Sequence, residues 1–133
     1  MQLTAAEVSF LVREYDEAIA FFTQALGYRL VQDTALGELA GHAKRWVVVA
    51  PPADGGANLL LARASTPEQQ AMVGRQGAGR VFLFLYTANF SASYDHMQRL
   101  SVRFTEAPRD EAYGRVVKFL DLYGNAWDLI ERN

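Results

Sequence analysis

The chain carries one structural pattern twice. Apolar and less apolar residues alternate over residues 8–12, and the same alternation returns 73 residues later, over residues 81–85. The run at residues 26–30 is echoed 74 residues later by the run at 100–104. The offset grows from 73 to 74 because the connection between these two runs is one residue longer in the second half. The sequence therefore predicts two similar halves.

Each half predicts the order strand, helix and three strands. In the first half, Asp16 is expected to cap a helix that runs to Leu26 and is stopped by Gly27. In the second half, Asn89 is expected to cap the equivalent helix. The strands of the first half are expected at residues 7–12, 28–31, 45–50 and 57–62. Those of the second half are expected at residues 81–86, 115–120 and 126–130, with the second strand in the run that echoes residues 26–30.

A short helix and a glycine-rich segment separate the halves. Thr66 is expected to cap a helix over residues 67–73, with Pro67 at its first position, where a missing N–H group costs nothing. Glycines at 74, 77 and 79 then form a linker. We therefore expect a single domain, residues 1–133, built from modules at about 1–64 and 79–133.

The predicted fold class is α+β. One face of each module's sheet can be covered by the module's own helix, and the other face needs a different cover. Two βαβββ modules in tandem are expected to form a curved mixed sheet around a cleft, with the helices on the outer face. Clefts of this kind are where small ligands usually bind.

Composition excludes several classes of protein. The chain has no Cys, which removes disulfide scaffolds and cysteine zinc sites. Its 15 acidic and 13 basic residues give a net charge of -2, so nucleic acid is not an expected partner. No apolar run reaches the roughly 20 residues of a membrane helix, and no signal peptide is visible. We expect a soluble cytoplasmic protein without a membrane partner.

The chain resembles the vicinal oxygen chelate superfamily, which includes glyoxalase I, bleomycin-resistance proteins and extradiol dioxygenases. In the first module the resemblance lies in residues 7–12, 15–22 and 26–28. In the second module it lies in residues 79–81 and in 119–129, which read FLDLYGNAWDL. The resemblance covers essentially the whole chain and implies a metal site in the enzymes of the family.

The resemblance also locates the metal positions, and this chain departs from the pattern there. The four positions hold Glu7, Leu60, Arg80 and Asp128. Leucine has no donor atom and arginine is a permanent cation, so two positions cannot bind a divalent ion. His42 and His96 do not replace the missing ligands. No metal and no cofactor are expected.

The charged residues at these positions suggest another arrangement. In the fold that the resemblance implies, Glu7, Arg80 and Asp128 project into one cavity, with the guanidinium between the two carboxylates. They are candidates for ligand binding, and an ion-pair network that only joins the modules is the alternative. In an enzyme, Glu7 and Asp128 are the candidate catalytic residues.

Strand alternation extends this candidate site. Side chains that share a face with Glu7 or Arg80 are expected to line the cavity. The resemblance implies that Tyr113 lies in a loop near the mouth of the cavity. For any one of the aromatic residues, core packing is the alternative, and Tyr113 can instead cap its strand. The further candidate ligand-binding residues are Trp46, Asn58, Phe82, Phe84, Tyr86 and Tyr113.

An aromatic-rich cavity without a metal favours binding over catalysis. The expected function is metal-independent binding of, or resistance to, a partly aromatic or apolar small molecule, by a homodimer. One alternative is a metal-dependent lyase, isomerase or dioxygenase of the same fold. Another is a non-catalytic interaction protein whose cleft is filled and which has no pocket for a ligand.

Overall fold

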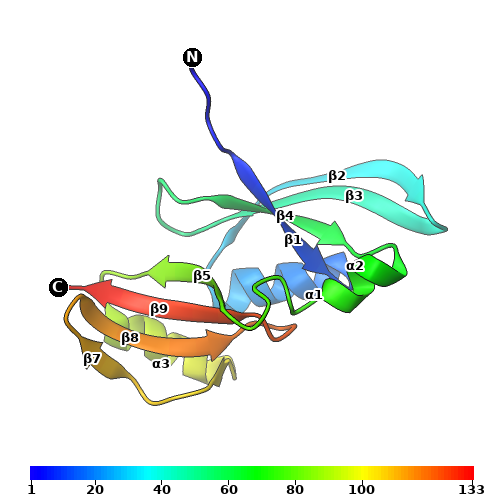
Figure 1. Cartoon of the computed structure of the whole chain (residues 1–133). Helices are drawn as coiled ribbons and strands as arrows, with labels where there is room; N and C mark the ends of the chain where they lie inside the picture. Colours follow the sequence, from blue (N-terminus) through cyan, green and yellow to red (C-terminus); the bar gives the residue numbers. More distant parts are fainter. The chain divides into compact units, whose positions relative to one another are not determined.

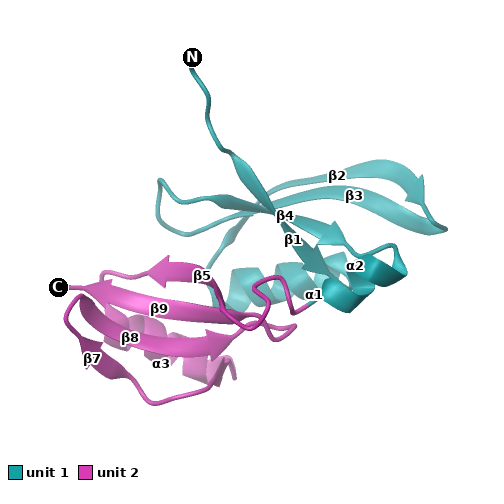
Figure 2. Ribbon diagram, viewed as in Figure 1, with its two compact units in different colours: residues 1–73 teal, residues 74–133 magenta.

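The structure is a computed structural model that describes all 133 residues. The chain divides into two compact units, residues 1–73 and 74–133 (Figure 2). Each unit contains one mixed sheet with helices, which confirms the α+β class. The short helix that we assigned to the linker belongs to unit 1.

Unit 1 has a four-stranded sheet of order β1-β4-β3-β2 (Figure 1). Strands β1 and β4 run parallel, whereas β4, β3 and β2 pair antiparallel. The helix α1 continues into a π-helical turn, η1. The elements are β1 (Glu7–Val12), α1 (Tyr15–Ala20), η1 (Phe21–Ala25), β2 (Arg29–Leu39), β3 (His42–Ala50), β4 (Asn58–Arg63) and α2 (Pro67–Met72).

One face of this sheet forms the core of unit 1. Helix α1 packs against β3 and β4, and the strand residues on that face, such as Phe10 and Leu61, are about 1% exposed. The Phe22 ring stands edge-on to Phe10 and to Tyr28, each at a centroid distance of 5.2 Å. Because strand residues alternate between faces, Ser9, Leu60 and their neighbours lie on the other face, without cover from α1.

Unit 2 repeats this topology. Its sheet has the order β5-β9-β8-β6, with β5 and β9 parallel, and β7 pairs with β8. Strands β5, β9, β8 and β6 hold the places of β1, β4, β3 and β2, so the duplicated sequence pattern has a duplicated topology. The elements are β5 (Val81–Tyr86), α3 (Phe90–Arg99), β6 (Arg103–Phe104), β7 (Arg109–Glu111), β8 (Gly114–Leu120) and β9 (Ala126–Arg132).

The turn between β8 and β9 is built around one buried carboxylate. Asp121 is 1% exposed, and its Oδ1 accepts hydrogen bonds from the backbone N–H groups of residues 123, 124 and 125 at 2.9–3.1 Å. Its Oδ2 accepts from Asn125 Nδ2 at 2.9 Å and from Trp127 Nε1 at 2.8 Å. The Trp127 ring then lies against Phe119, with centroids 5.7 Å apart. Asp121 therefore ties the turn to the unit 2 core.

The predicted caps are partly confirmed. Thr66 caps α2 by accepting from Gln69 N, with Pro67 in the first turn, and Asn89 caps α3 by accepting from Ala92 N. The prediction for α1 is wrong: the cap residue is Glu14, and Asp16 lies in the first turn, where it pairs with Arg45. The strand predicted at 28–31 is also too short, because it continues to Leu39 as the exposed edge strand β2.

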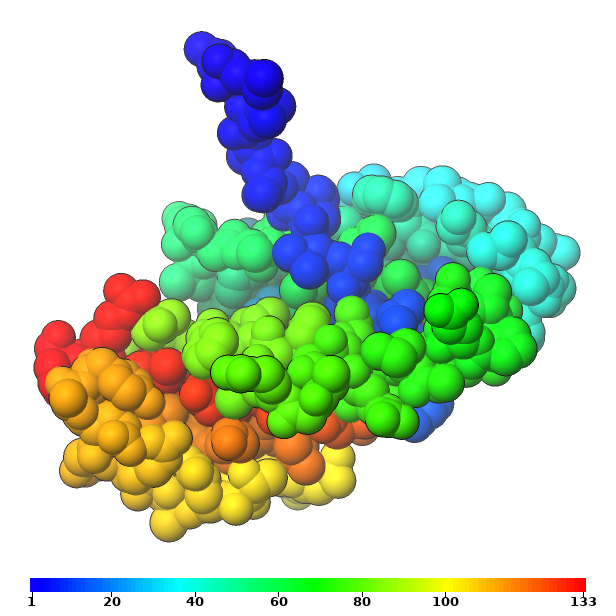
Figure 3. Space-filling model, in the orientation of Figure 1, coloured from blue at the N-terminus to red at the C-terminus, as the bar shows by residue number.

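The first six residues have no regular structure, and all are exposed. They extend away from the surface of unit 1, as the dark blue segment of Figure 3 shows. No helix of the structure has the length and apolar character needed to cross a membrane.

Candidate functional site

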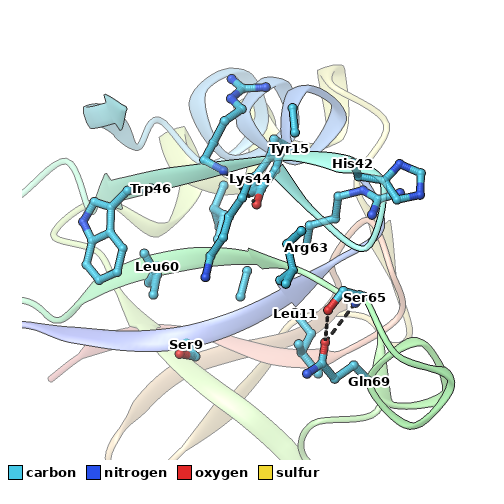
Figure 4. A pocket seen from close by; sticks show the side chains of 15 residues that line it. Ser9, Leu11, Tyr15, His42, Lys44, Trp46, Leu60, Arg63, Ser65 and Gln69 are labelled. Carbon is cyan, nitrogen blue, oxygen red and sulfur yellow. Dashed lines mark hydrogen bonds between the residues drawn. The ribbon is translucent and has the colours of Figure 1, made fainter. Parts of the chain in front are cut away.

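The open face of the unit 1 sheet carries a cavity of about 360 Å³, here called the Trp46 cavity. Its apolar walls come from three neighbouring strands, with Leu11 on β1, Leu60 on β4 and Trp46 on β3 (Figure 4). The Trp46 side chain is 38% exposed, so much of its ring is free to contact a ligand. The volume lies within the range of small-molecule pockets.

Cationic side chains surround these apolar walls. Lys44 projects from β3 two residues before Trp46 and forms no ion pair. Arg63, at the end of β4, is held by Glu14, whose two carboxylate oxygens accept at 3.2 Å. This guanidinium lowers the pKa of the Glu14 carboxyl below its usual value. Lys44 is therefore the polar group most available to anchor a ligand.

A network of side chains fixes one end of the cavity. The Arg45 guanidinium bridges Asp33 on β2 and Asp16 on α1, at 2.6 and 2.8 Å, and lowers the pKa of Asp33. The Arg45 backbone N–H donates to the Tyr15 hydroxyl at 3.2 Å, and its guanidinium carbon lies 5.0 Å from the Tyr15 ring centroid. These contacts position Tyr15, a further wall residue.

Unit 2 carries a second cavity, of about 410 Å³, on the open face of its own sheet. We call it the Asp128 cavity. The sheet register places Phe84 beside Asp128 and Tyr86 beside Ile130, so these four side chains share a face. Tyr113 and Arg132 complete the walls. Phe84, Tyr86 and Tyr113 are each about half exposed.

Asp128 is the chemically unusual group of this cavity. It is only 7% exposed, and its Oδ1 has no hydrogen-bond partner. Burial away from water raises the pKa of the Asp128 carboxyl. The positive charges of Lys118 and Arg109 lower this pKa and only partly oppose the shift. A buried carboxylate oxygen without a donor destabilises the fold and is typical of a functional group.

Substituting asparagine for Asp128 is expected to stabilise the protein at neutral pH. Because the folded-state pKa is raised, the ionised carboxylate destabilises the fold above that pKa, and the penalty disappears as the pH falls below the unfolded value. At pH 7.5, Asp128→Asn should raise the Tm by about 2–5 °C. Melting curves between pH 7.5 and 4 should show the gap closing, and a constant gap would contradict this account.

The structure distributes the predicted site residues between the two units. Trp46 lines the cavity of unit 1, whereas Phe84, Tyr86, Tyr113 and Asp128 line that of unit 2. Glu7, at the exposed start of β1, is paired in register with Asn58 on β4.

The other two predicted residues lie near the start of β5. Phe82 lies at a β-bulge, since Val81 pairs with Ala126 and Leu83 with Trp127, so simple alternation does not hold across it. Arg80 is exposed in the turn before β5, where its backbone N–H donates to Gly77 O at 3.0 Å.

The expected pairing of Arg80 with Asp128 is wrong. No ion pair joins them within unit 2, because Phe84 and not Arg80 is the register neighbour of Asp128.

Sequence reasoning missed several residues of the Trp46 cavity. Lys44 could have been found, because residues two apart on a strand share a face and Trp46 was already a candidate. Arg63 and Gln69 could not have been found from the sequence. The position of Arg63 at the cavity depends on where β4 ends, and that of Gln69 depends on how α2 packs after β4. Gln69 Oε1 accepts from Ser65 N at 2.9 Å and from Ser65 Oγ at 3.1 Å (Figure 4).

The residues at the family's metal positions do not fit a divalent ion. Leu60 presents only hydrocarbon to its cavity, and the Arg80 guanidinium repels a cation. The structure contains no group of three or more His, Cys, Asp or Glu residues that could hold a metal.

Known proteins resemble the chain over its full length. An uncharacterized protein of Shewanella frigidimarina is 46% identical over 133 residues, which is 100% of this chain and 96% of the relative. The crystal structure of UcmS2 matches with a TM-score of 0.79 and 25% identity, covering 98% of both chains. The structure of TnmS3, an antibiotic binding protein from Streptomyces sp. CB03234, matches with a TM-score of 0.76 and 24% identity, covering 100% of this chain and 99% of TnmS3.

The match to a family is equally broad. Residues 4–129 match the family described as Glyoxalase/Bleomycin resistance protein/Dioxygenase superfamily. This confirms the resemblance that the sequence motifs carried, and the structural matches confirm the fold. The chain therefore belongs to the glyoxalase/bleomycin resistance protein/dioxygenase superfamily.

Proposed function

We propose that this protein binds a partly aromatic or apolar small molecule without a metal ion, as a binding or resistance protein. The observation that carries the proposal is the Trp46 cavity. Its partly exposed indole and its leucine side chains lie beside Lys44, which forms no ion pair. A flat ligand can stack on Trp46 while one acceptor group contacts Lys44.

The family supports this proposal at the level of fold. TnmS3 is an antibiotic binding protein, and at 24% identity its likeness to this chain shows the shared fold alone. The ligand class for this chain therefore rests on the chemistry of its own cavities. Two cavities of 360 and 410 Å³ also argue against an interaction protein without room for a ligand.

An enzyme of the same fold is the second candidate function, as a lyase, isomerase or dioxygenase. The observation that favours it is Asp128, because a buried carboxyl group with a raised pKa suits a general acid or base. Glu7 is the second candidate catalytic residue, although it is exposed. Restoration of catalysis by an added divalent metal would favour this alternative over binding alone.

We also propose a homodimer that acts in the cytoplasm, with no nucleic acid partner. The exposed aromatic and aliphatic side chains on the open sheet faces support further burial in an assembly. The charge balance supports the absence of a nucleic acid partner.

A thermal-shift screen tests the proposed function. The library should contain flat aromatic acids, uncharged aromatic compounds and small hydrated metabolites of similar size. Binding to the native state raises the Tm, and a ligand at 100 times its Kd contributes about 2.7 kcal/mol. We expect hits of several degrees among the aromatic compounds. Hits confined to the hydrated metabolites would contradict the proposed ligand class.

A further inference from the structure

The Asp128 cavity combines a buried carboxylate with open aromatic rings. Oδ1 of Asp128 has no donor, although the residue is only 7% exposed. Its register neighbour Phe84 is 53% exposed. A buried acceptor that stays unpaired costs free energy, which a donor supplied by a bound molecule would recover.

The cations of unit 2 leave this carboxylate without a partner. Lys118, the register neighbour on β8, forms no ion pair with Asp128, and Arg109 is paired with Glu106 and Glu111. Arg132 instead lies over the Tyr86 ring, with its guanidinium carbon 3.9 Å from the centroid. Arg132 therefore already occupies the face of Tyr86, whereas Phe84 is exposed and the buried carboxylate oxygen of Asp128 is unpaired.

We propose that the Asp128 cavity binds the amino group of a flat apolar ligand as a cation. The ammonium N–H donates to Oδ1 of Asp128, and the adjoining ring packs on Phe84. This inference rests on the proposed function in taking the ligand to be a flat organic molecule. It adds that the ligand bound in the Asp128 cavity carries a positive charge.

Three probes with one ring system test the charge. They are 2-naphthylmethylamine, 2-naphthylmethanol and 2-naphthoate, titrated in the presence of a chelator. The backbone amide resonances of Phe84 and Tyr86 report binding at this cavity, and those of Trp46 and Leu60 report binding in unit 1. We expect the amine to bind unit 2 about tenfold more tightly than the alcohol, and the carboxylate to bind it most weakly.

Variants of Asp128 show whether its negative charge, and not the aromatic wall of the cavity, causes the preference for the amine. Asp128→Asn should abolish the preference for the amine, whereas Asp128→Glu, which keeps the charge, should retain it. The matched control is Asp110→Asn, since Asp110 is an exposed aspartate that pairs with Arg115 outside the cavity, and it should behave as wild type.

Equal binding of amine and alcohol by the wild type, or a preserved preference in Asp128→Asn, would overturn this inference. Binding of the alcohol in that case would still support the proposed function. If no probe shifts a resonance in either unit, both the inference and the proposed function are contradicted.

Discussion

Replacing Asp121 by alanine is expected to lower the Tm by about 10–20 °C. The substitution removes the carboxylate that accepts from the backbone N–H groups of residues 123 and 125, from Asn125 Nδ2 and from the Trp127 indole N–H. The Gly124 N–H keeps an acceptor, because it also donates to the Asp121 backbone oxygen. Unpaired buried donors cost about 1–3 kcal/mol each, and partial access of water to the turn reduces the total to about 3–5 kcal/mol. Denaturant unfolding followed by near-UV circular dichroism measures the loss.

Two further variants test the cause of this loss. Asp121→Asn keeps one acceptor oxygen but places an amide where Oδ2 accepts from Asn125 and Trp127, so we expect an intermediate effect. The control Asp110→Ala removes an aspartate that is 74% exposed and paired with Arg115, and should cost less than about 1 kcal/mol. Equal effects of Asp121→Ala and Asp110→Ala would show that the turn network does not stabilise unit 2.

Trp46→Ala is expected to weaken binding of the aromatic ligands found by the screen about 30- to 100-fold. The indole is the largest side chain that lines its cavity, and loss of a buried aromatic anchor costs about 2–3 kcal/mol. Because Trp46 is 38% exposed, the Tm should change little. Calorimetric titration measures the affinity.

The conservative variant Trp46→Phe should lose less than about tenfold, because a smaller ring still stacks. Fluorescence gives an independent readout, because the protein has two tryptophans and Trp127 is fully buried. Ligand stacking should therefore quench mainly Trp46. Unchanged affinity in Trp46→Ala would place the ligand elsewhere.

Periodicity predicted most of the fold because it depends on local rules. The alternation in β1 and β5, the caps at Thr66 and Asn89, and the repeat of the strand order all follow from the spacing of apolar and polar residues. The extent of β2 could not be predicted, because polar residues at 32–34 and Gly37 interrupt its apolar pattern and its hydrogen bonds come from β3. Pairing of this kind is set by tertiary contacts.

The site was less predictable than the fold. Strand alternation correctly placed Phe84 and Tyr86 on the face of Asp128. It failed at the start of β5, because Phe82 lies at a bulge and Arg80 precedes the strand. The unpaired Oδ1 of Asp128 was not visible in the sequence, since a missing partner depends on every side chain around it. The position of Lys44 could have been predicted, because residues two apart on a strand share a face.

Ligand binding by this protein is proposed to need no metal ion. The most direct test measures the Kd of the best ligand from the screen by calorimetry, first with excess chelator and then with an added divalent metal. Because two of the four family metal positions hold Leu60 and Arg80, we expect the same Kd in both conditions. Binding that is lost with chelator and restored by the metal would contradict it.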